Sequence, residues 1–106
     1  MPARLTTTLK ERFYASFTVE ESGCWLWNRQ LDGKGYGVIL DDQKPRREQR
    51  AHRVGYQLVK GDIPEGYDID HLCRNPRCVN PQHLEAVTHR ENVLRGAVAT
   101  VYQTGK

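Results

Sequence analysis

Three cysteines and one nearby histidine constrain this 106-residue chain more than any other feature. Four residues separate Cys73 from Cys78, and four more separate Cys78 from His83, a spacing typical of zinc knuckles. A set of three cysteines and one histidine fills every position of a tetrahedral zinc, so Cys24 is the expected fourth ligand. The alternatives are unligated thiols or a Cys73–Cys78 disulfide, which an intracellular protein rarely keeps. We therefore expect a structural metal site.

The size of the chain points in the same direction. A chain of this length forms one domain at most, and small domains often need a metal to become stable. With 38% hydrophobic and 27% charged residues, it has the composition of a globular protein. No apolar run approaches the ~20 residues of a membrane span, and Met1–Lys10 does not resemble a signal peptide. We expect an intracellular, cytoplasmic protein without a membrane partner.

Charge gives a further hint about partners. The formal net charge is only +3, but basic residues cluster between positions 44 and 53, where Glu48 is the only acid. Such a cluster is typical of a nucleic-acid contact, although many charge runs are simply solvated faces. The cluster consists of Lys44, Arg46, Arg47, Arg50 and Arg53.

Residue patterns predict an α+β chain of short elements. Thr8 and Glu11 form a capping box for a first helix, and Thr88 and Glu91 form another for the last helix. Gly61 and Gly96 are the expected ends of the second and last helices. The predicted helices span 5–17, 51–60 and 89–96, and the predicted strands span 24–27, 35–40, 67–70 and 84–87. A turn at 41–45 should lead into a return strand that carries Arg46, Arg47 and Arg50, and 72–82 should be a compact loop.

The apolar residues that fall on these elements make up the expected core. We assign to it Leu26, Val38, Ile39, Leu40, Val54, Leu58, Val59, Ile63, Ile69, Leu84, Val87, Val93 and Leu94, with some of the aromatic residues.

A second group of polar residues lies beside the cysteine loop. A neutral imidazole at His71 has a pKa suited to taking a proton from water near pH 7. Asp70 and Asn92 offer oxygen ligands for a divalent cation, if the last helix folds back over the strand. The alternative is a polar strand end at Asp70 and His71, with Asn92 exposed on the helix.

The segment Asp70–Leu84, followed by Thr88–Asn92, resembles the HNH endonucleases. It is most similar to a small, zinc-bearing phage type and to the related His-Cys box homing endonucleases. Cys24–Trp27, Gly35–Gly37 and Ala51–Val54 resemble further blocks of that type, so the resemblance covers about residues 12–96.

The resemblance implies a zinc-stabilised ββα-metal fold with an N-terminal β-hairpin and short helices, in which two strands and a helix hold one divalent cation. It implies His71 as the general base, with Asp70 and Asn92 as ligands of catalytic Mg²⁺ or Mn²⁺. It also implies Cys24, Cys73, Cys78 and His83 as structural Zn²⁺ ligands, and Asn80 as the residue that shapes the turn behind the base. Asn92 stands where many members of the family have histidine, and homing enzymes of the family have asparagine at this position.

The implied activity is one-metal hydrolysis of double-stranded DNA, which leaves 5′-phosphate and 3′-hydroxyl ends. Arg47 or Arg50 is the expected clamp on the phosphate, and the basic cluster should contact the DNA backbone, so affinity should fall steeply with salt. His52 could pack at the start of its helix or contact phosphate, and His89 could be an accessory ligand or simply exposed. The rival functions are a zinc-stabilised DNA-binding module without cleavage activity and a nuclease acting on RNA.

We expect one HNH domain over 1–106, and the resemblance to the phage type suggests that it is phage-encoded and acts in a bacterial host. Its parts are an arm at 1–20, a hairpin and helix at 24–60, a ββα core at 67–96 and a tail at 97–106. The tail is the expected contact of a homodimer, if cutting both strands requires one.

Overall fold

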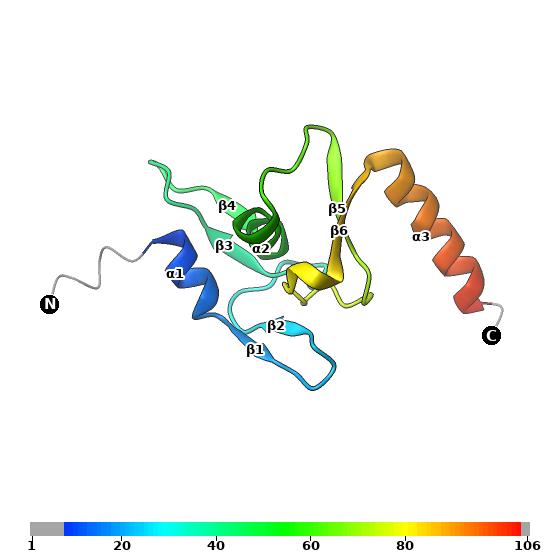
Figure 1. The fold of residues 1–106 in the computed structure, drawn as a ribbon, viewed down its shortest axis with the longest axis horizontal. Coiled ribbons are helices and arrows are strands. Elements are labelled where there is room, and N and C mark those ends of the chain that lie inside the picture. Colours follow the sequence, from blue (N-terminus) through cyan, green and yellow to red (C-terminus); the bar gives the residue numbers. More distant parts are fainter. Residues whose placement is uncertain (1–7, 105–106) are drawn as a thin grey trace, which may run out of the picture.

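The computed structural model describes residues 8–104, with side chains as far as Gly96. Its six strands pair into three two-stranded antiparallel sheets, β1–β2, β3–β4 and β5–β6 (Figure 1). The helices are α1 (Leu9–Tyr14), α2 (Ala51–Lys60), the 3₁₀ turn η2 (Pro81–His83) and α3 (His89–Thr104). The strands are β1 (Phe17–Val19), β2 (Trp25–Trp27), β3 (Val38–Leu40), β4 (Glu48–Arg50), β5 (Tyr67–His71) and β6 (Leu84–Thr88). The α+β class predicted from the sequence is confirmed.

The first helix forms as its capping box predicts, but it is shorter than expected. The Thr8 hydroxyl accepts from the Glu11 amide at 3.1 Å, and the Glu11 carboxylate accepts from the Thr8 amide at 2.8 Å. The helix ends at Tyr14, and Phe17 belongs to β1, where it pairs with Trp27. The predicted helix through Phe17 was therefore wrong at its C-terminal end, and residues 5–7 lie outside the described range.

The hydrophobic core lies between α1, α2, β2 and the loop that carries the cysteines. Leu58 and Val59 are exposed, because only one face of α2 packs on the body. Of the expected core, Val38, Ile39, Val54, Ile69, Leu84 and Val87 are buried, whereas Leu40, Leu58, Val59, Val93 and Leu94 are exposed. The central cluster is Phe13, Trp27, Ile39, Ala51, Val54 and Val79. The sequence analysis named Ile39 and Val54 and included aromatic residues without naming them, but it did not assign Ala51 or Val79 to the core.

Helix α2 has the predicted bounds and packs unusually close to its neighbours. Its last residue is Lys60, and the C-cap residue Gly61 has a φ of +97°, which suits glycine. A Cβ on Gly55 would lie 2.7 Å from Phe13 Cζ and 2.8 Å from the Val79 carbonyl oxygen. The absence of a side chain at Gly55 therefore allows α2 to approach both α1 and the cysteine loop.

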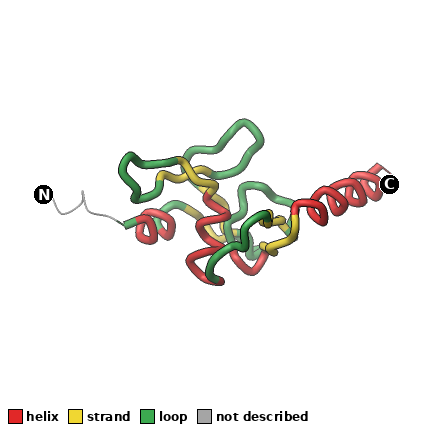
Figure 2. Tube along the Cα trace, turned by 90° about the horizontal axis from the view of Figure 1, so that it is seen from above, coloured by secondary structure: helices red, strands yellow, loops and turns green. Residues whose placement is uncertain are grey.

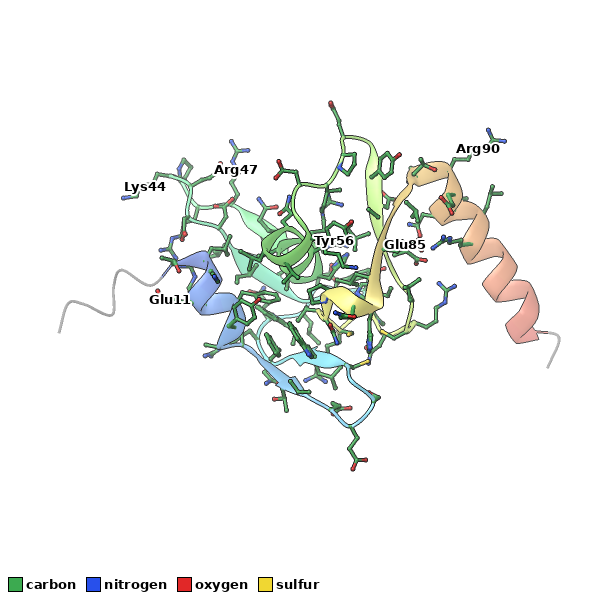
Figure 3. The ribbon with its side chains drawn as sticks, in the orientation of Figure 1. Glu11, Lys44, Arg47, Tyr56, Glu85 and Arg90 are labelled. Carbon is green, nitrogen blue, oxygen red and sulfur yellow. The ribbon has the colours of Figure 1, made fainter. Side chains whose placement is uncertain are left out.

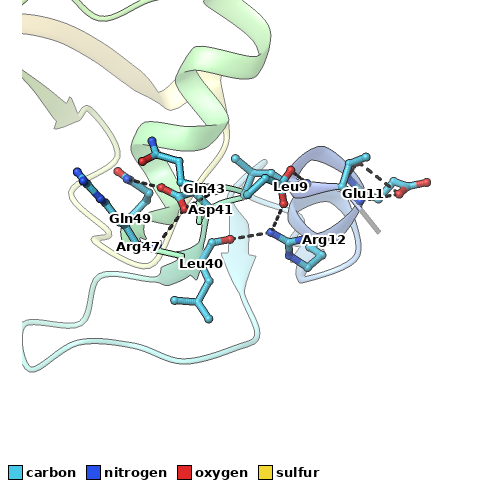
Figure 4. Close-up of polar contacts among 10 residues, drawn as sticks. Leu9, Glu11, Arg12, Leu40, Asp41, Gln43, Arg47 and Gln49 are labelled. Atoms are coloured by element: carbon cyan, nitrogen blue, oxygen red, sulfur yellow. Dashed lines mark hydrogen bonds and ion pairs between the residues drawn. The ribbon is translucent and has the colours of Figure 1, made fainter. Parts of the chain in front are cut away.

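The β3–β4 hairpin is held by two aspartates at its turn (Figure 4). The buried Asp41 carboxylate accepts from the amides of Gln43 and Arg47 at 3.0 and 2.9 Å and from Gln49 Nε2 at 3.0 Å. These bonds, the Arg47 amide foremost, lower the pKa of Asp41. Asp42 pairs with Arg12 of α1 at 2.9 Å. Because β4 begins at Glu48, the prediction that the return strand carries Arg46 and Arg47 was wrong; both lie in the turn.

The C-terminal elements form a ββα unit. In β5–β6, Tyr67 pairs with Thr88 and His71 pairs with Leu84, and the Thr88 hydroxyl then accepts from the Glu91 amide at 3.1 Å to begin α3. The predicted end at Gly96 was wrong, because one glycine weakens a helix by only about 1 kcal/mol. Helix α3 projects from the body (Figure 2), and no helix of the described range is long and apolar enough to span a membrane.

Candidate active site and metal centre

Four predicted zinc ligands come together in the structure. The ligand atoms of Cys24, Cys73, Cys78 and His83 all lie within 4.8 Å of one another. His83 Nδ1 is 3.6 Å from the sulfurs of both Cys24 and Cys78. Zn–S and Zn–N bonds of about 2.3 and 2.0 Å at a tetrahedral angle would separate sulfur and nitrogen by about 3.5 Å. The donor set and its spacing therefore fit one zinc ion.

The backbone brings Cys24 to this cluster from far away in the sequence. Leu26 forms an isolated antiparallel bridge with Cys78, in which the Trp27 amide donates to the Arg77 carbonyl at 3.0 Å. Asn80 caps η2 through the Gln82 amide at 2.9 Å and donates to the Gly23 carbonyl at 2.6 Å. These bonds join the end of the β1–β2 turn to the cysteine loop, so the cluster connects two sheets.

The thiols at this cluster are poorly solvated. Burial raises the pKa of Cys73, and it raises the pKa of Cys78 to about 12. Thiolates here need a nearby cation, and a bound dication supplies one. All three cysteines are free in the structure, so it does not contain the alternative Cys73–Cys78 disulfide.

A polar cavity lies next to the metal centre. Its volume is about 270 Å³, and it brings together Asp70 and His71 from β5 with Asn92 from α3. The other residues that line it are Lys34, Tyr36, Ile69, Arg74 and Pro76. None of the five residues of the predicted basic cluster lines this cavity.

His71 is fixed in one tautomer. Its Nε2 lies 3.0 Å from the Cys78 carbonyl oxygen, which can only accept, so Nε2 carries the proton. The other nitrogen, Nδ1, is then the unprotonated one. Burial lowers the pKa of His71, against the opposing effects of the Cys78 carbonyl and Asp70. The side chain is therefore a neutral imidazole at neutral pH, as a general base must be.

Two further rings pack against His71. The His52 ring lies 4.5 Å away and the Tyr36 ring 5.6 Å away, measured between centroids, and these two rings stack at 5.3 Å. Burial lowers the pKa of His52 to about 3, and its Nδ1 has no hydrogen-bond partner among the described residues. The Arg50 guanidinium covers the outer face of Tyr36 at 4.6 Å. His52 thus lies beside the candidate base, at the start of α2.

The loop before β3 places Lys34 and Tyr36 at the cavity. The Asp32 carboxylate accepts from the backbone amides of Lys34 and Tyr36 at 2.8 and 3.0 Å, and Gly35 turns the chain with a φ of +90°. The second oxygen of Asp32 pairs with Arg50 Nε at 3.1 Å. The sequence analysis did not assign Lys34 or Tyr36 to the site, because only the folded loop brings them there.

Charged neighbours surround the candidate metal ligands. Asp70 is buried, and its two oxygens lie 3.5 Å from Arg74 and 3.1 Å from Arg95. Asn92 Nδ2 donates to Asp68 Oδ2 at 3.0 Å, which turns its amide oxygen away from that bond. The Asp70 carboxylate and the Asn92 amide oxygen are the kinds of ligand that Mg²⁺ prefers.

His89 does not line the cavity. It is exposed, and its Nδ1 lies 2.9 Å from Asp68. The pair with His89 is the largest cause that lowers the pKa of Asp68.

The predicted basic cluster divides into two groups. Lys44 and Arg47 lie at the free end of the β3–β4 hairpin, on the other side of α2 from β5 and β6 (Figure 3). Arg50, by contrast, contacts Tyr36, which lines the cavity. Of the two predicted phosphate clamps, Arg50 is therefore the nearer to the candidate site.

Comparisons with known proteins agree with the geometry. The chain is 34% identical over 84 residues to "Protein 2.8" of Escherichia phage T7, and these residues cover 79% of this chain and 56% of that relative. It is 41% identical over 73 residues to "Uncharacterized gene 5.3 protein" of Enterobacteria phage T3, and the aligned part covers 68% of this chain and 72% of that relative. It is 35% identical over 69 residues to "Protein 7.7" of Escherichia phage T7, and the aligned part covers 65% of this chain and 51% of that relative. The chain thus spans about half the length of the two T7 relatives, and no solved structure matches it.

A family model described as HNH endonuclease matches residues 49–94, the range that contains Asp70, His71 and Asn92. The range also contains three of the four clustered zinc-type ligands, with Cys24 outside it. Together with the likeness to the phage T3 protein, this match identifies the ββα unit formed by β5, β6 and α3. The chain belongs to the HNH endonuclease family.

Proposed function

We propose that this protein is a divalent-metal-dependent endonuclease that hydrolyses double-stranded DNA. The observation that carries the proposal is the cavity in which a buried neutral histidine meets a carboxylate and an amide. These are the groups that hydrolysis of a phosphodiester requires, namely a base for water and ligands for a cation. The family match supports nuclease chemistry in general terms.

His71 is the proposed general base. Its Nε2 proton is engaged by the Cys78 carbonyl, so Nδ1 is free to take a proton from water. The water oxygen then bonds to phosphorus in line with the leaving group, and the bond from phosphorus to the 3′ oxygen breaks. The departing oxygen gains a proton from solvent, which leaves a 5′-phosphate and a 3′-hydroxyl.

Asp70 and Asn92 are the proposed ligands of one catalytic Mg²⁺ or Mn²⁺. When bound there, the cation would neutralise charge on the phosphate oxygens. Asp70 comes from the strand that carries His71, and Asn92 comes from α3, so the register of β5 and the start of α3 set their relative position. The Asp68 carboxylate orients the Asn92 amide by accepting from Nδ2.

Double-stranded DNA is the proposed partner, and the basic residues of the hairpin are its proposed contacts. Lys44, Arg46 and Arg47 are exposed around the β3–β4 turn, where they can reach phosphates beyond the site of cleavage. Arg50 directly precedes α2 and Arg53 lies in its first turn, and these two would contact the DNA backbone closer to the cavity. The likeness to phage proteins supports action inside an infected bacterial cell.

A plasmid-nicking assay with Mg²⁺ or Mn²⁺ tests the proposal. Wild type should nick and linearise supercoiled DNA, and His71→Ala should lower the rate about 10²- to 10⁴-fold, because a positioned base contributes that much. Zinc content and circular dichroism control for folding of the variant. If wild type and variant leave the plasmid equally intact with every cation tried, the proposed cleavage of DNA is wrong, and the two rival functions replace it.

Substrate and product analysis test the finer points. Duplex DNA should be cut faster than RNA of the same sequence, and preferential cutting of RNA would replace the proposed substrate. The cut ends should be joined by DNA ligase without prior phosphorylation, which requires a 5′-phosphate and a 3′-hydroxyl.

A further inference from the structure

Arg74 has a backbone conformation that its side chain does not favour. Its φ is +63°, and it is the only non-glycine residue with a positive φ in the described part of the chain. Such a conformation is costly for a residue with a Cβ, and most chains place glycine or asparagine there. The turn is tight, because the Arg74 amide donates to the His71 carbonyl at 3.1 Å. Strain of this kind concentrates at functional sites.

The Arg74 side chain extends into the cavity beside the candidate base. Its guanidinium lies 3.5 Å from Asp70 Oδ1, and the side chain is half exposed at 49%. Asp70 does not depend on this contact, since Arg95 holds its other oxygen at the shorter distance of 3.1 Å. A long, half-exposed ion pair contributes little to the stability of a protein. Folding stability alone therefore does not explain an arginine at this position.

Other arginines near the site are already engaged. Arg95 contacts three carboxylates, those of Asp70, Glu85 and Glu91, at 2.8–3.1 Å. Arg50 pairs with Asp32 and covers Tyr36. Among the described residues, the cations that line the cavity are Arg74 and Lys34, and Lys34 has no ion-pair partner in that part of the chain.

We propose that Arg74 is a catalytic residue that binds the non-bridging oxygens of the scissile phosphodiester, with Lys34 as a second cation beside it. The inference rests on the proposed nuclease function and names the protein group that receives the reacting phosphate. A planar guanidinium can donate two parallel hydrogen bonds to a phosphate. Negative charge grows on those oxygens during attack, so a donor fixed beside them lowers the barrier.

Replacement by glycine separates this role from a structural one. Arg74→Gly suits a positive φ, so its melting temperature should be no lower than that of wild type. Its kcat on plasmid DNA should nevertheless fall about 10²-fold, the typical effect of losing one such donor. Added methylguanidine should restore part of the lost rate, because it can occupy the space left by the side chain. Arg74→Asn, which also tolerates this conformation, should behave similarly.

Arg29→Gly is the matched control. It removes the same charge from an exposed loop residue that does not line the cavity and does not have a positive φ. Its kcat should stay near that of wild type, and methylguanidine should not change it. Lys34→Ala should raise KM more than it lowers kcat.

Two results would overturn the assignment of Arg74 alone, and a third would overturn the proposed function as well. If Arg74→Gly cuts as fast as wild type, the proposed function stands and Arg74 has no catalytic role. If the rate falls with the melting temperature and methylguanidine restores nothing, Arg74 is a structural residue. Failure of the wild-type protein to cut any nucleic acid would refute the proposed function itself, and this inference with it.

Discussion

His71 and Asn92 each use one polar atom to bind the protein and leave the other for chemistry. His71 donates Nε2–H to the Cys78 carbonyl, and Asn92 donates Nδ2–H to Asp68. Such partners fix which atom of a side chain faces a metal or a substrate. At this scale the site depends as much on Cys78 and Asp68 as on the residues that perform the proposed reaction.

Removal of the Asp68 carboxylate should impair the cation site without unfolding the protein. Asp68→Ala deprives the Asn92 amide of its acceptor, and the loss of a hydrogen bond that orients a metal ligand typically costs about 10- to 100-fold in metal affinity or activity. The concentration of Mn²⁺ that gives half-maximal cleavage should rise accordingly, as measured in a metal titration. Asp62→Ala, at an exposed acid of the loop before β5, serves as the control. An unchanged titration for Asp68→Ala would mean that Asn92 does not hold the cation.

His52 should make the fold sensitive to acid. The pKa of His52 is about 3 in the folded chain, against an ordinary value of 6.5. Between these two pH values the unfolded chain therefore binds a proton at His52 and the folded chain does not. The stability that His52 contributes is complete above pH 6.5 and is lost as the pH falls towards 3. Between pH 6.5 and 5 this loss amounts to about 2 kcal/mol.

Urea unfolding of wild type and His52→Phe at pH 7.5 and pH 5 measures the effect. Phenylalanine keeps a ring against His71 but cannot be protonated, so the variant should lose less stability in acid. Release of zinc lowers the stability of both proteins, and the comparison removes that contribution. Parallel losses in the two proteins would show that His52 is not a buried neutral group.

Site residues that lie close together in the sequence could be predicted from their spacing. Site residues that only the folded chain brings to the cavity could not. Cys73, Cys78 and His83 lie close together in the chain, so their spacing was enough to predict a cluster. Arg74 and Lys34 have no such signal, because they reach the cavity only through a left-handed turn and an aspartate-capped loop. An arginine, unlike a glycine or an asparagine, gives no sign of a positive φ in the sequence.

Elements with strong local signals form where the sequence predicts them. Helix α2 has the predicted bounds, with Gly61 after its last residue, and both capping boxes begin helices. Strands of three residues carry little local information, so β1 appears only through its pairing with β2. The apolar spacing that suggested a helix through Phe17 instead continues from α1 into β1. Phe17 of β1 faces the neighbouring strand β2, where its ring stacks on Trp25 with centroids 4.5 Å apart.

Two glycines on helices should respond in opposite ways to alanine. Gly55→Ala places a methyl group 2.8 Å from a backbone oxygen, so it should destabilise the fold by about 1–3 kcal/mol despite better helix propensity. Gly96→Ala on α3 meets nothing within 4 Å and should gain up to about 1 kcal/mol of helix stability. Chemical denaturation and helical ellipticity measure both effects. A Gly55→Ala variant as stable as wild type would contradict the close packing of α2.

At the scale of the molecule, residues 8–104 contain three separate two-stranded sheets and a small core. Isolated hairpins of this size are marginal in water, so each sheet depends on what it is attached to. The cysteine and histidine cluster attaches the loop of the β5–β6 unit to the start of β2. The metal centre is therefore a connection between elements that the hydrophobic core joins only in part.

Loss of a zinc ligand should unfold the molecule rather than merely weaken the site. Purified protein should contain about one zinc per chain, and Cys73→Ser should lose it, together with most of the melting transition. Metal analysis and a thermal melt, with and without a chelator, give the two readouts. Zinc-free protein that keeps a cooperative melt at the wild-type temperature would show that the core alone stabilises the fold.

Cys78 belongs to both sites at once, because its sulfur faces the zinc cluster and its carbonyl oxygen holds the His71 ring. Any chemistry performed on that sulfur therefore reaches the proposed base through a single residue. Loss of the metal should free the loop at Cys78, and the His71 imidazole should then lose the acceptor that selects its tautomer. The structural metal should therefore influence the proposed reaction from a distance, through a residue that takes no part in it.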